Sequence, residues 1–307
     1  ITRYCIGIET ELTATIMIKD GSIESDILSL VRAFGLSRME AIREVKILFA
    51  HAIGLGQLDL IKEPSLMSDP LHIEKYKKLF QDRINGKPIA YILGEKEFYG
   101  LSFKVNEHVL IPRPETELLV DVAIEKIQSH NLKRVLDLGT GSGAITISVA
   151  INAPGVDVVA ADISKNALKV AEANVRSLCP GASISFVESN WFSKVSGTFD
   201  LILANPPYIA ADDSHLNSPE LRYEPRGALV SGPEGLDAIS EILEQGQSFL
   251  NEGGWLFFEH GYDQLGLCQD LLAEQGFMSL FNAVDLSGNP RISGGRIGVV
   301  TRTAYGC

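Results

Sequence analysis

The chain has 307 residues, of which 45% are hydrophobic and 21% are charged. This length and balance predict a soluble globular protein of about two domains, with enough apolar residues for a sizeable core. Lysines and arginines total 27 against 39 aspartates and glutamates, which gives a formal charge of −12. Proteins bind nucleic acids largely by neutralising backbone phosphates with lysine and arginine. Because so acidic a surface cannot do this over a large area, we expect no direct nucleic-acid partner.

The sequence shows no targeting or metal-binding pattern. No apolar stretch reaches the roughly 18 residues that a membrane span needs, so we expect no membrane partner. Glu9, Glu11 and Asp20 lie where a signal peptide would be apolar. The four cysteines and six histidines have neither the paired spacing of zinc sites nor that of a disulfide framework. We therefore expect a cytoplasmic monomer without a bound metal.

The N-terminal part of the chain has a helical pattern. Apolar residues recur at helical spacing from Ile23 to about Asn85, which predicts three or four amphipathic helices. Ser37, with Glu40 three places on, is a typical N-terminal cap for one of them. We expect residues 1–86 to form a small helical domain. Two β-prone runs, 91–99 and 101–105, then predict a β-hairpin within a linker of residues 87–112.

Helices and strands alternate after Pro112, which predicts an α/β domain over residues 113–307. Repeated strand–helix units of this length imply a mainly parallel, Rossmann-like sheet with helices on both faces. The long irregular stretch from Ile209 to Glu234 is predicted to be a lid or a substrate wall. Helices are expected at 115–129, 143–152, 164–176, 235–250 and 263–275, and strands at 133–138, 156–161, 183–188, 199–204, 254–259, 278–285 and 296–301.

A glycine-rich turn, Gly139-Thr140-Gly141-Ser142-Gly143, follows the first strand of this domain. Its three glycines remove Cβ atoms and permit unusual φ values, so a ligand can approach the backbone closely. A nicotinamide cofactor is the obvious competitor for such a turn. Asp137, ahead of the turn, would repel a pyrophosphate but suits a cationic methyl donor. We therefore predict a site for S-adenosylmethionine.

Further donor-binding residues are predicted after the second and third strands. Asp162 stands at about the separation expected for a carboxylate that accepts both ribose hydroxyls, and Ile163 lies beside it. The alternative for Asp162 is an N-terminal cap of helix 164–176, although Ser164 could serve there alone. Asn190 and Trp191 are predicted to flank the adenine, with core packing of Trp191 as a nearly equal alternative.

Asn205-Pro206-Pro207-Tyr208 directly follows the apolar run 201–204. A planar NH2 attacks a methyl donor only if acceptors hold both of its N–H groups. The Asn205 side-chain oxygen and the Pro206 carbonyl supply these, because the following proline lacks an N–H and keeps Pro206 extended. The Tyr208 ring offers a face for stacking. A strand-end turn is the alternative, but we expect all four residues to bind the substrate and Asn205 also to contact the donor.

Together these motifs resemble those of the HemK/PrmC family, the protein-(glutamine-N5) methyltransferases that modify peptide chain release factors. The resemblance covers nearly the whole chain and includes segments 86–94, 111–117 and 224–226. Segment 111–117, together with the helical N-terminal domain, separates this family from the adenine-N6 methyltransferases. Two residues depart from the family pattern. Asn190 stands where an acidic residue is more usual, and His260, expected to be a packing variant, replaces isoleucine.

The resemblance implies a seven-strand methyltransferase domain that uses S-adenosylmethionine and releases S-adenosylhomocysteine. It implies that the acceptor is the glutamine of a Gly-Gly-Gln loop in a release factor, and that residues 1–86 help to bind this partner. It also places Arg113 and Glu115 near the substrate. A capping role in the first turn of helix 115–129 is an equal alternative for Glu115, and Arg113 is expected to face the partner or a carboxylate.

The reaction hypothesis is a direct in-line displacement without a general base. Asn205 and Pro206 fix the NH2 of the glutamine, Tyr208 stacks on the amide plane, and these three residues are the predicted catalytic residues. Adenine-N6 methylation of nucleic acid is one alternative, because it uses the same acceptor pair, but the acidic charge counts against it. A non-catalytic docking protein that binds S-adenosylmethionine is the other, and the intact segment 205–208 counts against that.

Overall fold

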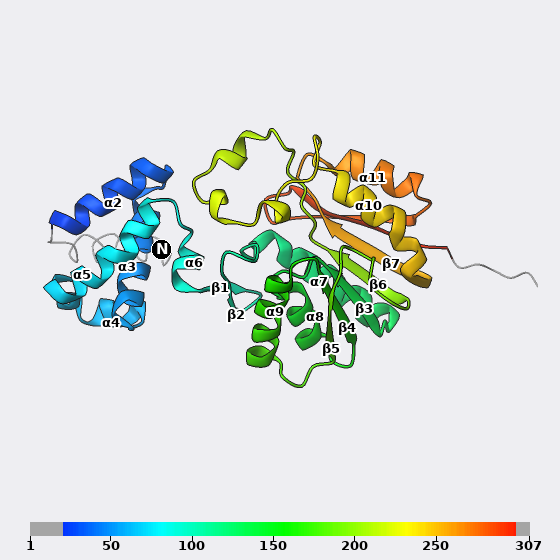
Figure 1. Ribbon diagram of the computed structural model, residues 1–307, viewed down its shortest axis with the longest axis horizontal. Helices are drawn as coiled ribbons and strands as arrows, with labels where there is room; N and C mark the ends of the chain where they lie inside the picture. The colour runs from blue at the N-terminus through cyan, green and yellow to red at the C-terminus, as the bar shows by residue number, and fades with distance from the viewer. Residues whose placement is uncertain (1–20, 299–307) are drawn as a thin grey trace, which may run out of the picture. The chain divides into compact units, whose positions relative to one another are not determined.

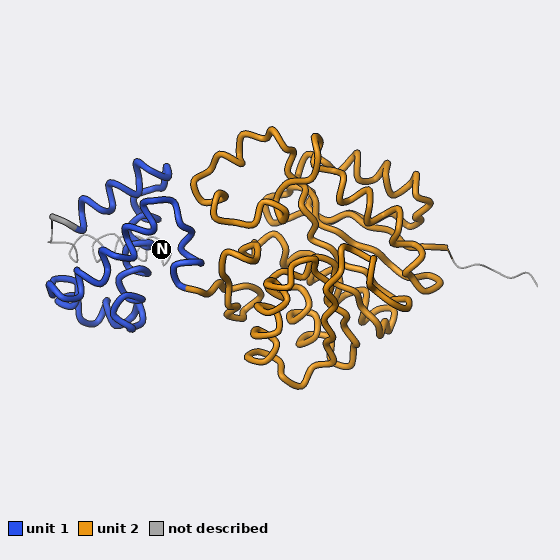
Figure 2. The backbone as a smooth tube through the Cα atoms, in the orientation of Figure 1, with its two compact units in different colours: residues 1–93 blue, residues 94–307 orange. Residues whose placement is uncertain are grey.

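The computed structural model describes residues 21–298. The chain divides into two compact units, residues 1–93 and 94–307, which Figure 2 colours separately. This division falls after Leu93, inside the segment that the sequence predicts to be a linker. The hairpin of that segment therefore belongs to the second unit.

The first unit is a set of amphipathic helices whose ends follow the caps in the sequence. Helix α3 begins at a capping box in which the Ser37 hydroxyl accepts the N–H of Glu40 and the Glu40 carboxylate accepts the N–H of Ser37. It ends at Gly54, whose φ of 71° is left-handed. The helices are α2 (Gly21–Phe34), α3 (Arg38–Ile53), α4 (Gln57–Lys62), α5 (Pro70–Ile84) and α6 (Ile89–Leu93), with the 3₁₀ helix η1 (Pro64–Ser68) between α4 and α5.

Two buried polar contacts join α2, α3 and α5. The Arg83 guanidinium, only 1% exposed, donates to both carboxylate oxygens of Glu44 at 2.8 and 3.1 Å. It also lies 3.7 Å from the ring centroid of Phe34. Asp26 accepts the Tyr76 hydroxyl at 2.9 Å. Because a buried charge is costly once its partner is removed, these contacts fix how the three helices pack around their apolar core.

The segment before the hairpin differs from its predicted structure. Residues 91–93 belong to helix α6 rather than to a strand, and Tyr91 is buried. The helix ends at Gly94, which has a φ of 75°, and the hairpin of β1 (Glu95–Phe98) and β2 (Leu101–Lys104) follows. Tyrosine and isoleucine favour strands locally, and the strand was predicted from residue 91 for that reason. The prediction was wrong because burial of this segment in the folded protein outweighs the local preference.

The second unit is built on a seven-stranded sheet in the order β5-β4-β3-β6-β7-β9-β8. Its first five strands are parallel, and β9 pairs antiparallel with both β7 and β8. Helices α7, α8 and α9 cover one face and α10 and α11 the other (Figure 1). The predicted α/β class with a helical N-terminal part is confirmed. The strands are β3 (Arg134–Leu138), β4 (Asp157–Asp162), β5 (Ile184–Glu188), β6 (Phe199–Ala204), β7 (Leu250–Glu259), β8 (Met278–Val284) and β9 (Pro290–Arg296), and the helices are α7 (Glu117–His130), α8 (Ala144–Asn152), α9 (Lys165–Leu178), α10 (Asp237–Gly246) and α11 (Leu265–Glu274).

Alternate residues of the central strands serve two separate apolar cores. Trp255 and Phe257 of β7 pack in the core under α7 and α8. Leu256 and Phe258 pack in the core under α10 and α11. Because both faces are covered, the central strands consist of nearly continuous apolar runs, which made them predictable from the sequence.

The last strand lies earlier than predicted. β9 spans Pro290–Arg296, whereas the sequence analysis places the strand at 296–301, of which residues 299–301 lie outside the described part of the chain. Glycine is depleted in strands, so this segment does not resemble one. A Cβ at Gly294 would lie 2.2 Å from the Phe257 ring and 2.3 Å from the Leu256 carbonyl oxygen. The strand can pair with β7 only because glycine stands there.

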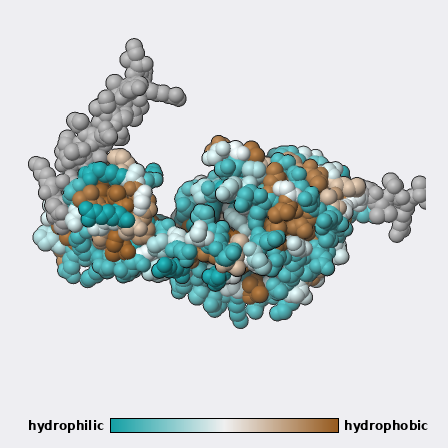
Figure 3. Space-filling view, turned by 90° about the horizontal axis from the view of Figure 1, so that it is seen from above, coloured by the Kyte–Doolittle hydropathy of each residue, from teal (hydrophilic) through white to brown (hydrophobic). Residues whose placement is uncertain are grey.

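The surface is largely hydrophilic in the view of Figure 3. Within residues 21–298, no helix combines the length and the apolar character needed to cross a bilayer. Large apolar side chains that are exposed include Leu58 and Leu71 in the first unit and Ile163 in the second. Ile163 is relevant below because it borders a cavity.

We expect Gly294→Ala to lower the free energy of unfolding by about 1–3 kcal/mol, because the added methyl group would collide with backbone as well as with a ring. Urea unfolding followed by circular dichroism measures this. Gly266→Ala in α11 is the matched control, since its Cβ would meet no heavy atom within 4 Å. The control should be neutral or stabilising by up to about 1 kcal/mol. Equal stability of the two variants would contradict the packing argument.

Candidate active site

The candidate site lies where the parallel strands end. The pairing of β3, β6 and β7 brings Gly139, Asn205 and Glu259 side by side at the ends of these strands. Asp162, at the end of β4, completes the row because β4 pairs with β3 up to the same level. Ligands of open α/β sheets bind at this edge.

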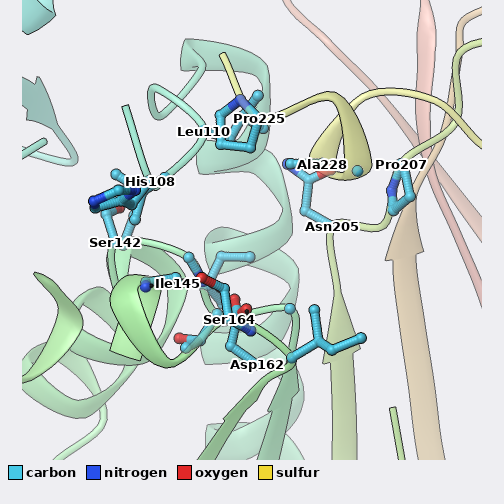
Figure 4. Close-up of a pocket in the computed structure, with 18 of the residues that line it drawn as sticks. His108, Leu110, Ser142, Ile145, Asp162, Ser164, Asn205, Pro207, Pro225 and Ala228 are labelled. Carbon is cyan, nitrogen blue, oxygen red and sulfur yellow. Dashed lines mark hydrogen bonds between the residues drawn. The ribbon is translucent and has the colours of Figure 1, made fainter. Parts of the chain in front are cut away.

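A cavity of about 470 Å³ adjoins this row, within the roughly 300–1,000 Å³ that is typical of small-molecule sites. In Figure 4, Asn205 and Pro207 lie on one side of it and His108 and Ser142 on the other. Most of the predicted site residues line it, namely Arg113, Gly139, Thr140, Gly141, Ser142, Asp162, Ile163, Asn190, Trp191, Asn205 and Pro207. Five predicted residues lie outside its lining, namely Glu115, Asp137, Gly143, Pro206 and Tyr208.

The glycine turn has the unusual backbone that its sequence suggests. Gly139, Gly141 and Gly143 have φ values of 72°, 55° and 81°, in the left-handed region that other residues rarely adopt. A Cβ at Gly143 would also lie 3.2 Å from the Cβ of Ala171 in α9. Gly143 therefore serves the close packing of α8 on α9 rather than the cavity wall.

Asp137 lies beneath the turn and is fully buried. One of its carboxylate oxygens accepts the hydroxyls of Thr140 at 2.7 Å and Thr146 at 2.6 Å. Burial, with a smaller contribution from the nearby Asp162, raises its pKa to about 6 against the lowering effect of the two hydroxyls. Asp137 thus orders the turn through Thr140, and its direct contact with a donor stays a prediction.

Asp162 stands in the cavity wall with its carboxylate oriented by backbone groups. It accepts the N–H of Gly141 at 2.9 Å and that of Ser164 at 2.8 Å. The side-chain cap of α9 is Ser164, which accepts the N–H of Ala167. Burial raises the pKa of Asp162. Because Ser164 fills the capping role, Asp162 remains free to accept ribose hydroxyls, and that role stays a prediction.

Trp191 forms the wall beside the turn in a conformation rare for its type. Its φ is 41°, and a Cβ on Gly139 would meet the Trp191 ring at 3.6 Å. Ser189 holds this conformation, because its hydroxyl donates to the Trp191 carbonyl at 2.8 Å and accepts the N–H of Lys194. Ile163, 68% exposed, borders the same cavity. The sequence analysis missed Ser189, whose role depends on this local turn.

A buried carboxylate connects two of the residues predicted to be catalytic. The Asn205 amide nitrogen donates to the Thr116 hydroxyl at 3.0 Å, and that hydroxyl donates to Glu259 at 2.6 Å. The Tyr208 hydroxyl donates to the other oxygen of Glu259 at 3.0 Å. Burial raises the pKa of Glu259, which is 1% exposed. Pro206 is buried, and its acceptor role stays a prediction.

Arg113 and the long irregular segment meet in an ion pair. The Arg113 guanidinium donates to Glu224, whose other oxygen accepts the N–H of Ile111 at 3.0 Å. Arg113 therefore faces a carboxylate, one of the two outcomes expected. Glu115 lies half-buried in the single 3₁₀ turn η2 (Pro114–Thr116) ahead of α7. The irregular segment itself contains the short 3₁₀ helices η3 (Ser214–Asn217), η4 (Leu221–Tyr223) and η5 (Arg226–Ala228).

Two buried amides that the sequence analysis missed hold the site from behind. Asn174 of α9 donates to the carbonyls of Ser142 at 2.8 Å and Lys104 at 3.0 Å, which ties the glycine turn to the hairpin. Gln264 donates to the Tyr208 carbonyl at 3.1 Å. A sequence signal existed for Asn174, because it is a polar residue on the buried stripe of an amphipathic helix.

His260 takes no part in the cavity wall. Its ring is fully buried, with Nδ1–H donating to the Gly261 carbonyl at 2.8 Å and Nε2 accepting the Ser293 hydroxyl at 2.9 Å. Burial lowers its pKa, so the ring is held neutral. Both nitrogens are thereby satisfied, as expected of a packing variant. Among residues 21–298, no three His, Cys, Asp or Glu side chains are grouped as metal ligands would be.

The comparisons with known proteins agree with this geometry. Residues 115–220 match the methyltransferase small domain, and residues 33–94 match the PrmC N-terminal domain. The catalytic domain of hMettl16, solved in complex with an RNA hairpin, has the same fold, with a TM-score of 0.54 and 18% identity over 69% of this chain and 82% of that one. The fold and the match to the methyltransferase small domain together define a methyltransferase.

Curated relatives identify the family. The release factor glutamine methyltransferase of Bordetella pertussis is 41% identical over 85% of this chain and 95% of its own length. That of Burkholderia pseudomallei is 42% identical over 87% of this chain and 95% of its own length. The chain belongs to the release factor glutamine methyltransferase family.

The buried Asp137 predicts a pH-dependent stability. Its folded-state pKa of about 6 lies above its ordinary value of 3.8, so the ionised form destabilises the folded protein above pH 6, and this effect is lost as pH falls towards 3.8. Asp137→Asn removes the effect. The free energy of unfolding of the variant, relative to the unaltered protein, should rise by about 1–2 kcal/mol between pH 5 and pH 8.

Urea unfolding at both pH values measures this difference. Glu125→Gln on α7, which removes an exposed charge of the same sign, controls for the change in net charge. A difference between Asp137→Asn and the unaltered protein that stays constant with pH would show that Asp137 has no raised pKa.

Proposed function

We propose that this protein transfers a methyl group from S-adenosylmethionine to the side-chain amide nitrogen, N5, of the glutamine in the Gly-Gly-Gln loop of peptide chain release factors. The observation that carries the proposal is the held amide of Asn205. Its nitrogen is engaged by Thr116, which leaves its oxygen as the acceptor at a cavity beside a glycine turn. The names of the curated relatives support the same substrate.

The charge of the cavity supports a cationic donor. Among the described residues that line it there is no lysine, and its arginine, Arg113, is paired with Glu224. A pyrophosphate would therefore lack a free cation, whereas Asp162 offers an acceptor and Trp191 an apolar ring to an adenosine. When bound, S-adenosylmethionine supplies an electrophilic methyl group on a sulfonium and leaves as S-adenosylhomocysteine.

The acceptor residues of this chain act by position rather than by proton transfer. The lone pair of a glutamine amide nitrogen is delocalised, so the nitrogen attacks only when both N–H groups are held and it can lose planarity. We assign one N–H to the Asn205 oxygen and the other to the Pro206 carbonyl, with the Tyr208 ring against the amide plane. These dipoles stabilise the positive charge that develops on nitrogen, and the proton leaves to water after the attack.

Two segments of this chain are proposed to bind the release factor. The segment from Ile209 to Glu234 is proposed to form the wall against which the Gly-Gly-Gln loop lies, because Glu224 anchors it to the cavity through Arg113. The helical N-terminal part is proposed to bind the body of the release factor, which its match to the PrmC N-terminal domain supports.

Methyl transfer from labelled S-adenosylmethionine to a purified release factor tests the proposal. We expect label on the native factor and none on a Gly-Gly-Ala loop variant, on duplex DNA or on single-stranded DNA. Label on DNA, or equal label on the loop variant, would refute the glutamine assignment and leave the donor site in place.

Asn205→Ala should separate catalysis from donor binding. We expect kcat to fall on the order of 100-fold or more, because an acceptor aimed at developing charge is removed, while the Kd of the donor changes little. Calorimetry with S-adenosylmethionine gives the Kd, and the labelled assay gives kcat. Asn282→Ala, an exposed position on the edge strand β8, is the matched control. Full methylation by Asn205→Ala would indicate a different acceptor.

A further inference from the structure

Thr116 occupies the N-terminal cap position of α7 but does not cap the helix. Threonine at such a position normally accepts an N–H of the first turn. Here its hydroxyl makes no capping hydrogen bond. It lies instead between Asn205 and Glu259, 89 and 143 residues away in the sequence. A side chain of a capping type has thus been directed towards the active site.

The direction of the hydrogen bonds follows from the number of protons. In its ionised form, which the two donated hydroxyls favour against the effect of burial, Glu259 can only accept. It then takes the single hydroxyl proton of Thr116 on one oxygen and that of Tyr208 on the other. The Thr116 oxygen can then act only as an acceptor towards Asn205. Its partner must therefore be the NH2 group of the Asn205 amide and not the amide oxygen. A flipped Asn205 would bring two oxygens together at 3.0 Å with no proton between them.

Glu259 is a costly residue for packing alone. It is 1% exposed, and its neighbour on β7, Phe258, belongs to an apolar core. The charge of Arg291 acts on its carboxylate, but within residues 21–298 no Lys, Arg or His lies within 4 Å to form an ion pair with it. An apolar side chain would fill this place without the desolvation cost of a buried carboxylate. Groups of this kind gather at functional sites.

We propose that Glu259 and Thr116 are positioning residues that lock the Asn205 amide with its oxygen towards the substrate, and that Glu259 at the same time fixes the Tyr208 ring. The inference rests on the proposed function, because it concerns how Asn205 holds the glutamine. Thr116 lines the cavity and Glu259 does not, and the positioning role of neither residue requires contact with the substrate. Without them the Asn205 amide would occupy both orientations. In one of these its NH2 group, rather than its oxygen, would face the NH2 group of the substrate glutamine.

Thr116→Val is the main test, since valine has the shape of threonine without its hydroxyl. We expect kcat with a release factor to fall by about 10- to 100-fold, while the KM for the release factor and the Kd of the donor stay within about threefold. Thr116→Ser, which restores the hydroxyl, should recover kcat to within about threefold. A variant with unchanged kcat would overturn the proposal.

A double-mutant cycle separates positioning from general damage to the fold. In an Asn205→Ala background there is no amide to orient, so adding Thr116→Val should lower the remaining rate by less than about twofold. Independent, additive losses would indicate that Thr116 acts only on stability. Should Thr116→Val not fold, Thr116→Ala, which also lacks the hydroxyl, is measured in its place, and its kcat should also fall about tenfold or more.

The side-chain amide resonances of Asn205 give a test that needs no substrate. In the unaltered protein and in Thr116→Ser, we expect one set of NH2 signals with slowed hydrogen exchange. In Thr116→Val we expect loss of this protection, and unchanged protection would overturn the proposal. This measurement also separates a failure of the proposed function from a failure of the positioning role of Thr116. If the unaltered protein does not methylate a release factor, the proposed function fails, whereas a locked amide would still show that Thr116 orients Asn205.

Discussion

The parallel register of β3, β6 and β7 is the constraint on which the candidate site depends. Parallel strands end at the same edge of a sheet, so three segments far apart in the sequence must deliver Gly139, Asn205 and Glu259 to one line. The register of the strands alone therefore places the glycine turn beside Asn205. Every other feature of the site refines this alignment.

The refinement comes from buried polar groups that each serve two segments. Asn174 joins the glycine turn to the hairpin, Glu224 joins Arg113 to the irregular segment, and Glu259 joins Thr116 to Tyr208. A buried polar group left without its partner is costly, so each of these groups tolerates only one arrangement of its two segments. These links hold the segments around the cavity to one another.

The parts of the molecule that could be predicted are those with local signals. The glycine turn, Asp162 and the segment 205–208 follow buried strands, and the apolar runs of those strands are visible in the sequence. By contrast, β9 was misplaced because the ring of Phe257 on a neighbouring strand requires a glycine at position 294, and the link from Thr116 to Glu259 spans 143 residues. Such features depend on tertiary neighbours, which a single sequence does not reveal.

The two tryptophans of the chain lie in very different surroundings. Trp191 borders the cavity against the glycine turn, whereas Trp255 is buried on the sheet near Lys126 and His130. The emission of Trp255 should therefore be a constant background. The protein carries its own optical reporter, because a change in tryptophan fluorescence when the cavity fills would come from the ring of Trp191.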